Sequence, residues 1–149
     1  MADLISAHPF FRGLDKSYVS FLAGCATNVH YARGEYIFRE GEAADRFLIV
    51  RYGLVSLRTN IPGRGDVTIQ TVGEDDVLGW SWLFAPYRWN FSAYCLEETR
   101  AVSFDGVCLR TKCSEDHDLG YEMMARFAAI MTQRLQATRL QLLDVYGKN

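Results

Sequence analysis

The alternation of hydrophobic and polar positions divides the chain into three parts. Residues 1–26 have a helical pattern, and Asp15 is placed to cap a short helix over residues 16–24. From residue 27 to 104, short runs of β-branched and aromatic residues lie between glycines and acidic clusters, which is typical of β-strands. We expect strands at residues 28–31, 36–39, 46–52, 54–59, 67–72, 76–78, 90–96 and 100–104.

Turns that contain glycine separate these strands. The pair Tyr52-Gly53 predicts a tight turn, and the stretch from Pro62 to Asp66 predicts a longer hairpin loop. Many short strands joined in this way indicate a sandwich, a barrel or a jelly roll. We therefore expect a mainly β fold, an antiparallel β-roll or jelly roll (a cupin-like double-stranded β-helix) with flanking helices, in a single domain over residues 1–149.

The pattern becomes helical again after Phe104. Asp105 can cap a short helix that reaches Cys113, and Ser114 or Asp116 can cap a long helix that reaches about residue 145. Inside the long helix, mostly apolar residues recur at alternating spacings of four and three over 22 residues, which is an a/d heptad pattern. This stripe predicts a homodimer seam, and the alternative is packing on its own domain. The seam consists of Met124, Ala128, Met131, Leu135, Thr138, Leu142 and Val145.

Composition and charge narrow the classes of function. The 16 basic and 18 acidic residues give a net charge of −2, which does not favour non-specific binding to nucleic acid. No stretch has the pattern of a signal peptide or a membrane span, so we expect a cytoplasmic protein with its four cysteines as reduced, buried thiols. The three histidines are scattered and form no H-x-H pair, so we expect neither a metal nor another cofactor.

Four stretches form a recognisable set: residues 34–45 (GEYIFREGEAAD), 47–55 (FLIVRYGLV) and 76–79 (DVLG), and the pair Arg134-Leu135 in the long helix. Together they resemble the cyclic-nucleotide-binding domain, the sensor module of catabolite activator proteins and of cyclic-nucleotide-gated channels and kinases. The resemblance implies a non-enzymatic module that binds a small ligand such as cAMP or cGMP and signals through a partner or a dimer. The family's transcription factors carry a helix-turn-helix domain after the long helix. Only residues 146–149 follow the seam here, so this chain would not bind DNA in that way, and we expect a stand-alone sensor, the alternative being a piece of a larger protein.

The resemblance places the ligand site in residues 78–94 (LGWSWLFAPYRWNFSAY). In the family, a Gly-Glu pair opens a short helix whose amides face the cyclic phosphate, and a Pro-Arg pair follows about ten residues later. Here the glycine is present, a tryptophan replaces the glutamate, the arginine lies one residue early, and a serine matches the Ser/Thr position after it. The ligand-binding residues implied by the resemblance are Gly79, Trp80, Ser81, Trp82, Leu83, Arg88, Trp89 and Ser92.

These departures leave several hypotheses open. The segment can bind a cyclic nucleotide, or its aromatic residues can line a pocket for a different anionic or aromatic ligand. They can also fill the pocket, which would leave an interaction domain without a ligand. A cupin-like enzyme on the same roll is the alternative from another class. If the pocket takes an anion, Arg88 is the expected charge partner, assisted by Ser92 and the amides of residues 79–82.

Overall fold

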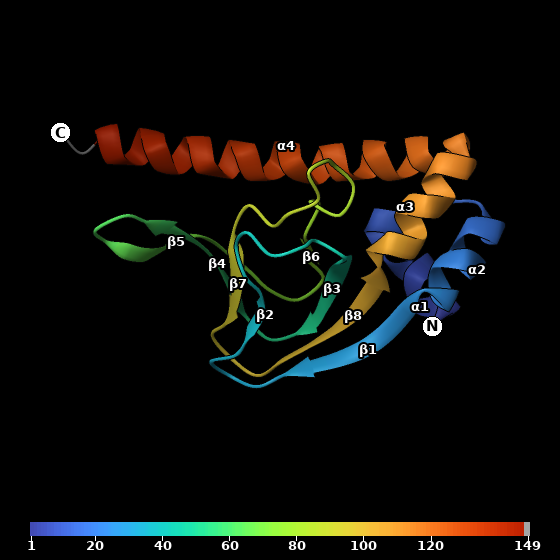
Figure 1. Cartoon of the computed structure of the whole chain (residues 1–149), viewed down its shortest axis with the longest axis horizontal. Helices are drawn as coiled ribbons and strands as arrows, with labels where there is room; N and C mark the ends of the chain where they lie inside the picture. The colour runs from blue at the N-terminus through green and yellow to red at the C-terminus, as the bar shows by residue number, and fades with distance from the viewer. Residues whose placement is uncertain (148–149) are drawn as a thin grey trace.

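Two four-stranded antiparallel sheets form the centre of the computed structural model, which describes residues 1–147 (Figure 1). The first sheet has the order β1-β8-β3-β6 and the second has the order β2-β7-β4-β5. The strands are β1 (Ala26–Tyr31), β2 (Tyr36–Phe38), β3 (Arg46–Tyr52), β4 (Val55–Ile61), β5 (Gly65–Val72), β6 (Val77–Leu78), β7 (Ser92–Cys95) and β8 (Thr99–Asp105). The expected antiparallel β-roll with flanking helices is confirmed.

Strand β3 separates two hydrophobic cores. Phe47 and Ile49 pack on the side of the helices, in a cluster that includes Phe127, whereas Leu48 and Val50 belong to the core inside the roll. Successive side chains of a strand point to opposite faces, so a strand covered on both faces is an unbroken hydrophobic run. This explains the sequence FLIV at the centre of β3.

Short helices from both ends of the chain gather at one end of the roll (Figure 1). They are α1 (Ala2–Ala7), the 3-10 helix η1 (Pro9–Phe11), α2 (Lys16–Gly24) and α3 (Gly106–Glu115). The side chain of Asp15 caps α2, and that of Asp105 caps α3, as predicted. The segment 1–26 was expected to be helical, but the pattern did not predict the bounds of α1, because this six-residue helix buries only Ile5 and has no periodic stripe.

Helix α4 (His117–Gly147) runs along the whole roll and ends above the tip of the β4–β5 hairpin (Figure 1). Of the two residues proposed to cap it, Asp116 accepts hydrogen bonds from the amides at the start of the helix, whereas the Ser114 hydroxyl donates to a carbonyl within α3. The buried residues of α4 are Leu119, Met123 and Phe127, all in its first half. Within residues 1–147, none of the helices has the length and apolar composition that a membrane span requires.

Candidate functional site

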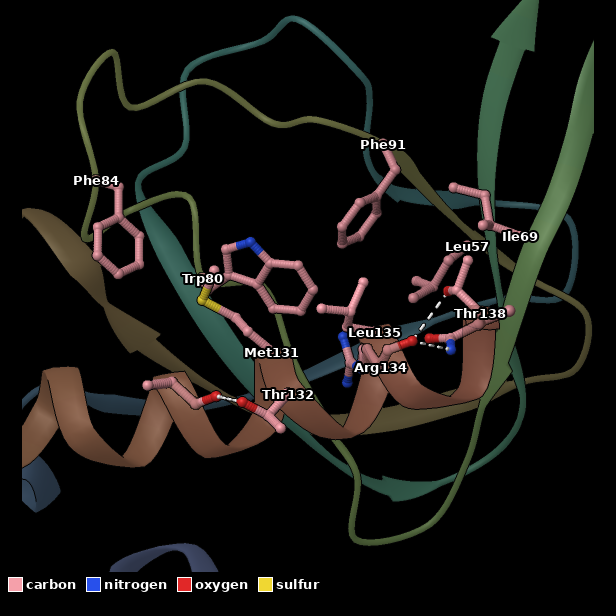
Figure 2. A pocket seen from close by; sticks show the side chains of 12 residues that line it. Leu57, Ile69, Trp80, Phe84, Phe91, Met131, Thr132, Arg134, Leu135 and Thr138 are labelled. Carbon is pink, nitrogen blue, oxygen red and sulfur yellow. Dashed lines mark hydrogen bonds between the residues drawn. The ribbon is translucent and has the colours of Figure 1, made fainter. Parts of the chain in front are cut away.

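A cavity of about 610 Å³ lies between the roll and α4 (Figure 2). Pockets of roughly 300–1,000 Å³ are the usual size for small-molecule ligands. Most of the wall is apolar, and the polar groups come from Gln70 and from one side of α4. The lining residues are Leu57, Ile69, Gln70, Trp80, Phe84, Phe91, Ala128, Met131, Thr132, Arg134, Leu135 and Thr138.

The aromatic part of the wall comes from the segment that joins β6 and β7. The rings of Trp80 and Phe91 meet edge to face, with centroids 5.6 Å apart and planes at 71°. Figure 2 shows both rings opposite Met131 and Leu135 of the helix. A flat ligand between these groups would be in contact with carbon on both of its faces.

The guanidinium of Arg134 is the one positive group on the cavity wall. Its Nη2 atom donates a hydrogen bond to the carbonyl oxygen of Val77, and its Cζ atom lies 5.2 Å from the centroid of the Trp80 ring. Its Nη1 atom is buried and has no hydrogen-bond partner among residues 1–147. Burial lowers the pKa of Arg134 to about 10, and the negative charge of Asp76 opposes this shift, so the group is charged at neutral pH.

The other polar side chains of the wall already bond to the backbone of α4. The hydroxyl of Thr132 donates to the carbonyl of Ala128 at 2.8 Å, and that of Thr138 donates to the carbonyl of Arg134 at 2.9 Å (Figure 2). The amide of Gln70 donates to the same Arg134 carbonyl at 3.1 Å. The two hydroxyl donors and one donor of the Gln70 amide are therefore engaged by the helix.

Trp89 fills the interior of the roll next to Gly79. Its ring stacks on that of Phe38, with centroids 3.7 Å apart and planes at 8°, and the residue is only 2% exposed. A Cβ atom on Gly79 would lie 2.8 Å from Cζ3 of Trp89, and Gly79 has a φ of +94°. Both the close approach of the indole and the backbone conformation therefore require glycine at this position.

Arg88 lies on the outside of the roll, away from the cavity. It is exposed, and its Nη1 atom donates to the carbonyl oxygen of Gly41 at 3.1 Å. Residues 87–89 run beside residues 42–44, where the amide of Trp89 donates to the carbonyl of Glu42. Because neighbouring side chains of an extended segment point to opposite sides, the one-residue offset from the family pattern turns Arg88 outward and Trp89 inward.

The remaining residues expected at the ligand site also serve the packing of the roll. Ser81, Trp82 and Leu83 are buried, and Trp82 stacks on Phe47 with centroids 5.5 Å apart. The hydroxyl of Ser92 accepts a hydrogen bond from the amide of Glu40 at 2.9 Å. Of the eight residues implied by the resemblance, only Trp80 lines the cavity, and a binding role for the others stays a prediction.

The expected dimer seam lies on the same side of α4 as the cavity. Its large apolar members are exposed on the single chain, including Leu135 at 70% and Val145 at 61%. Four of the seven seam residues also line the cavity: Ala128, Met131, Leu135 and Thr138. A ligand in the cavity would therefore touch the surface through which a dimer is expected to form.

Sequence reasoning did not assign the cavity residues Leu57, Ile69 and Arg134 to a ligand site, and it placed Phe91 only within the segment 78–94. The sequence singles out Arg134 only as part of the resemblance to the family. Which side of α4 faces the roll depends on packing between distant segments. The alternation along the strand at residues 54–59 places Leu57 on an inner face, but that pattern does not distinguish a core residue from a cavity residue.

The four cysteines are free thiols. Cys95 is buried and Cys25 and Cys113 are half-buried, but Cys108 is exposed on α3, so the expectation of burial was wrong for Cys108. In the part of the chain that the structure describes, no three His, Cys, Asp or Glu side chains lie together in a way that could hold a metal ion.

An antiparallel β-roll, with a long C-terminal helix closing over a ligand-sized cavity, defines the class of protein to which this chain belongs. The family model of the cyclic nucleotide-binding domain matches residues 28–116. The chain belongs to the cyclic nucleotide-binding domain family, and the resemblance drawn from its motifs is confirmed.

Individual relatives are similar over nearly the whole chain. The CRP-like cAMP-activated global transcriptional regulator of Mycobacterium tuberculosis is 26% identical over 145 residues, which are 97% of this chain and 63% of that protein. This chain thus spans less than two thirds of that relative's length. A crystal structure from Geobacter metallireducens GS-15, named as a cyclic nucleotide-binding protein, has a TM-score of 0.83 and 25% identity, covering 90% of this chain and 97% of that one. The Thermus thermophilus catabolite activator protein shares the fold, with a TM-score of 0.69 and 22% identity over 93% of this chain and 63% of its own.

Proposed function

We propose that this chain is a regulatory module that binds a small ligand between the roll and α4 and signals through a homodimer or a protein partner. Membership of the cyclic nucleotide-binding domain family supports a regulatory role, and one relative is named as a cAMP-activated transcriptional regulator. The observation that carries the proposal is that seam residues of α4 also line the cavity.

The shared face suggests how binding would be communicated. A ligand in the cavity would contact Met131, Leu135 and Thr138 from the roll side, while a second copy would contact the same stripe from outside. A ligand shifts a conformational equilibrium only by its difference in affinity for the two states. A ligand in contact with the seam would bind with different affinity to two positions of α4, because a movement of α4 changes both the cavity wall and the dimer surface.

The family makes cAMP and cGMP the first ligands to test. Three other readings stay open: a different small anion or aromatic compound, a ligand-free interaction domain, and a cupin-like enzyme. Stoichiometric bound metal or turnover of a substrate would favour the enzyme. Cytoplasmic location and the homodimer remain predictions from the sequence.

The proposal is tested by calorimetric titration with cAMP and cGMP, together with mass spectrometry of small molecules released from the native protein. We expect one bound ligand per chain and a change in the dimer dissociation constant when the ligand is present, measured by sedimentation. A protein that releases no ligand, binds neither nucleotide and sediments identically under all conditions would contradict it.

Two leucines of α4 offer a matched pair of variants. Leu135 and Leu140 are 70% and 63% exposed, but only Leu135 lines the cavity. Leu135→Ala is expected to weaken the binding of whichever ligand is found and to change dimerisation, whereas Leu140→Ala is expected to leave ligand affinity unchanged. Equal effects on ligand affinity would show that binding does not take place in this cavity.

A further inference from the structure

We propose that the ligand of this cavity is an amphipathic monocarboxylate, with a flat apolar body against Trp80 and its carboxylate beside the guanidinium of Arg134. This rests on the proposed function and names the chemical class of its ligand. The class differs from a cyclic nucleotide, in which a polar sugar and a phosphate make up about half of the molecule.

The anionic end follows from the position of Arg134. A buried charged group is costly unless it is paired and hydrogen-bonded. The ion pairs found within residues 1–147 do not include Arg134, and its Nη1 atom lacks an acceptor there. The nearby Asp76 carboxylate accepts a hydrogen bond from the amide of Gly73 in the β5–β6 turn. Arg134 lines the cavity, and its planar guanidinium matches the geometry of a carboxylate, so such a ligand supplies the missing counter-charge.

The apolar body follows from the rest of the wall. Trp80, Phe84 and Phe91 supply rings on the roll side, and Met131 and Leu135 supply aliphatic groups on the helix side (Figure 2). Polar ligand groups placed against these carbons would lose their hydration without gaining hydrogen bonds. The hydroxyls of Thr132 and Thr138 already donate to the helix backbone. One charged group and an otherwise apolar, planar body therefore fit the wall better than several polar groups do.

The interior of the roll supports the same assignment. Trp89 occupies the space next to Gly79, and Arg88 points to the outside. A nucleotide phosphate at that position would meet the indole of Trp89 rather than a guanidinium. The cationic side chain of the cavity wall is Arg134 on α4, and an anion is expected to bind beside it.

The test compares 2-naphthoate with its uncharged analogue 2-naphthamide by calorimetric titration of the full chain. Because hydrogen bonds to charged groups are strong, we expect the wild type to bind 2-naphthoate about ten-fold or more tightly than 2-naphthamide. Arg134→Met is expected to abolish this preference and to leave the affinity for 2-naphthamide nearly unchanged. Arg139→Met, the same substitution on the same helix but outside the cavity lining, is expected to keep the wild-type preference.

Because Arg134 also bonds to Val77, thermal melting must show that Arg134→Met is folded, and Arg134→Lys serves as a second variant that keeps the positive charge. The assignment would be overturned if Arg134→Met still binds 2-naphthoate more tightly than 2-naphthamide. It would also be overturned if Arg134→Lys binds the two compounds equally. Either result would leave the proposed function intact. If cAMP or cGMP binds more tightly than 2-naphthoate and displaces it from the cavity, the carboxylate assignment is overturned in favour of a nucleotide. Failure of the wild type to bind either naphthalene compound would overturn the assignment, and the titration with cAMP and cGMP then decides separately whether the proposed function stands.

Discussion

Replacing Trp89 tests whether the interior of the roll is filled by this side chain or open to a ligand. Trp89→Ala removes a ring that is almost fully buried and stacked on Phe38. A buried tryptophan covers roughly 150–250 Å². At about 25 cal/mol per Å², this corresponds to about 4–6 kcal/mol as an upper bound, and buried Trp→Ala substitutions cost about 3–5 kcal/mol. We expect a loss of about 4 kcal/mol in the free energy of unfolding.

The assay is urea unfolding followed by far-UV circular dichroism, which does not depend on the deleted fluorophore. With a slope of about 2 kcal/mol per M, the midpoint is expected to fall by about 2 M. Trp89→Phe, which keeps a ring next to Phe38, should lose about 1–2 kcal/mol and reports on the site if the alanine variant does not fold. Trp80→Ala is the control, since this half-exposed ring lines the cavity, and its midpoint should fall by less than half as much. A change for Trp89→Ala no larger than that of Trp80→Ala would refute the argument that the indole fills the roll.

Three further measurements address the dimer, the outer arginine and the thiols. Leu135→Glu places a charge on an exposed apolar position of the seam, so sedimentation should show folded monomers where the wild type forms dimers. A wild type that is already monomeric would contradict the prediction that this stripe forms a dimer. Arg88→Ala is expected to leave anion affinity unchanged because this side chain bonds to the Gly41 carbonyl on the outer face, and a loss of about ten-fold or more would restore the role implied by the family pattern. Burial, followed by the charge of Asp116, raises the pKa of Cys113 to about 11, so the folded protein keeps a proton that the unfolded chain loses from about pH 9. Stability should therefore fall as the pH rises from about 9 to 11, and the same scan of Cys113→Ser should show a smaller fall.

Local patterns explain how much of the fold was predictable. The carboxylates of Asp15 and Asp105 cap the helices that follow them, because capping depends only on residues two or three positions away. The hydrophobic run in β3 likewise reports that both of its faces are covered. No bounds were predicted for helix α1 because it buries only one side chain, Ile5, and so gives no periodic apolar stripe.

The candidate site was less predictable because it depends on how distant segments pack. The sequence showed that the arginine lies one residue early, but the consequence depends on residues 42–44 running beside residues 87–89. That pairing decides that Arg88 faces solvent and that Trp89 faces the core. The cavity itself depends on which side of α4 meets the roll, and a helix that is apolar on two neighbouring faces does not reveal this by its spacing alone.

Arg134 is attached to both sheets at once. Its carbonyl oxygen accepts a hydrogen bond from Gln70 in β5, and its guanidinium donates to Val77 in β6, and these strands belong to different sheets. This residue is therefore a natural pivot for α4, with 13 helical residues beyond it in the described helix. At ~1.5 Å per residue, the far end lies ~20 Å from the pivot, so a tilt of about 10° would move it by about 3–4 Å. Apolar contacts weaken within about 1 Å of separation. A partner helix packed on Leu142 and Val145 would thus respond to small movements at Arg134 far more strongly than one packed on Met124 and Ala128.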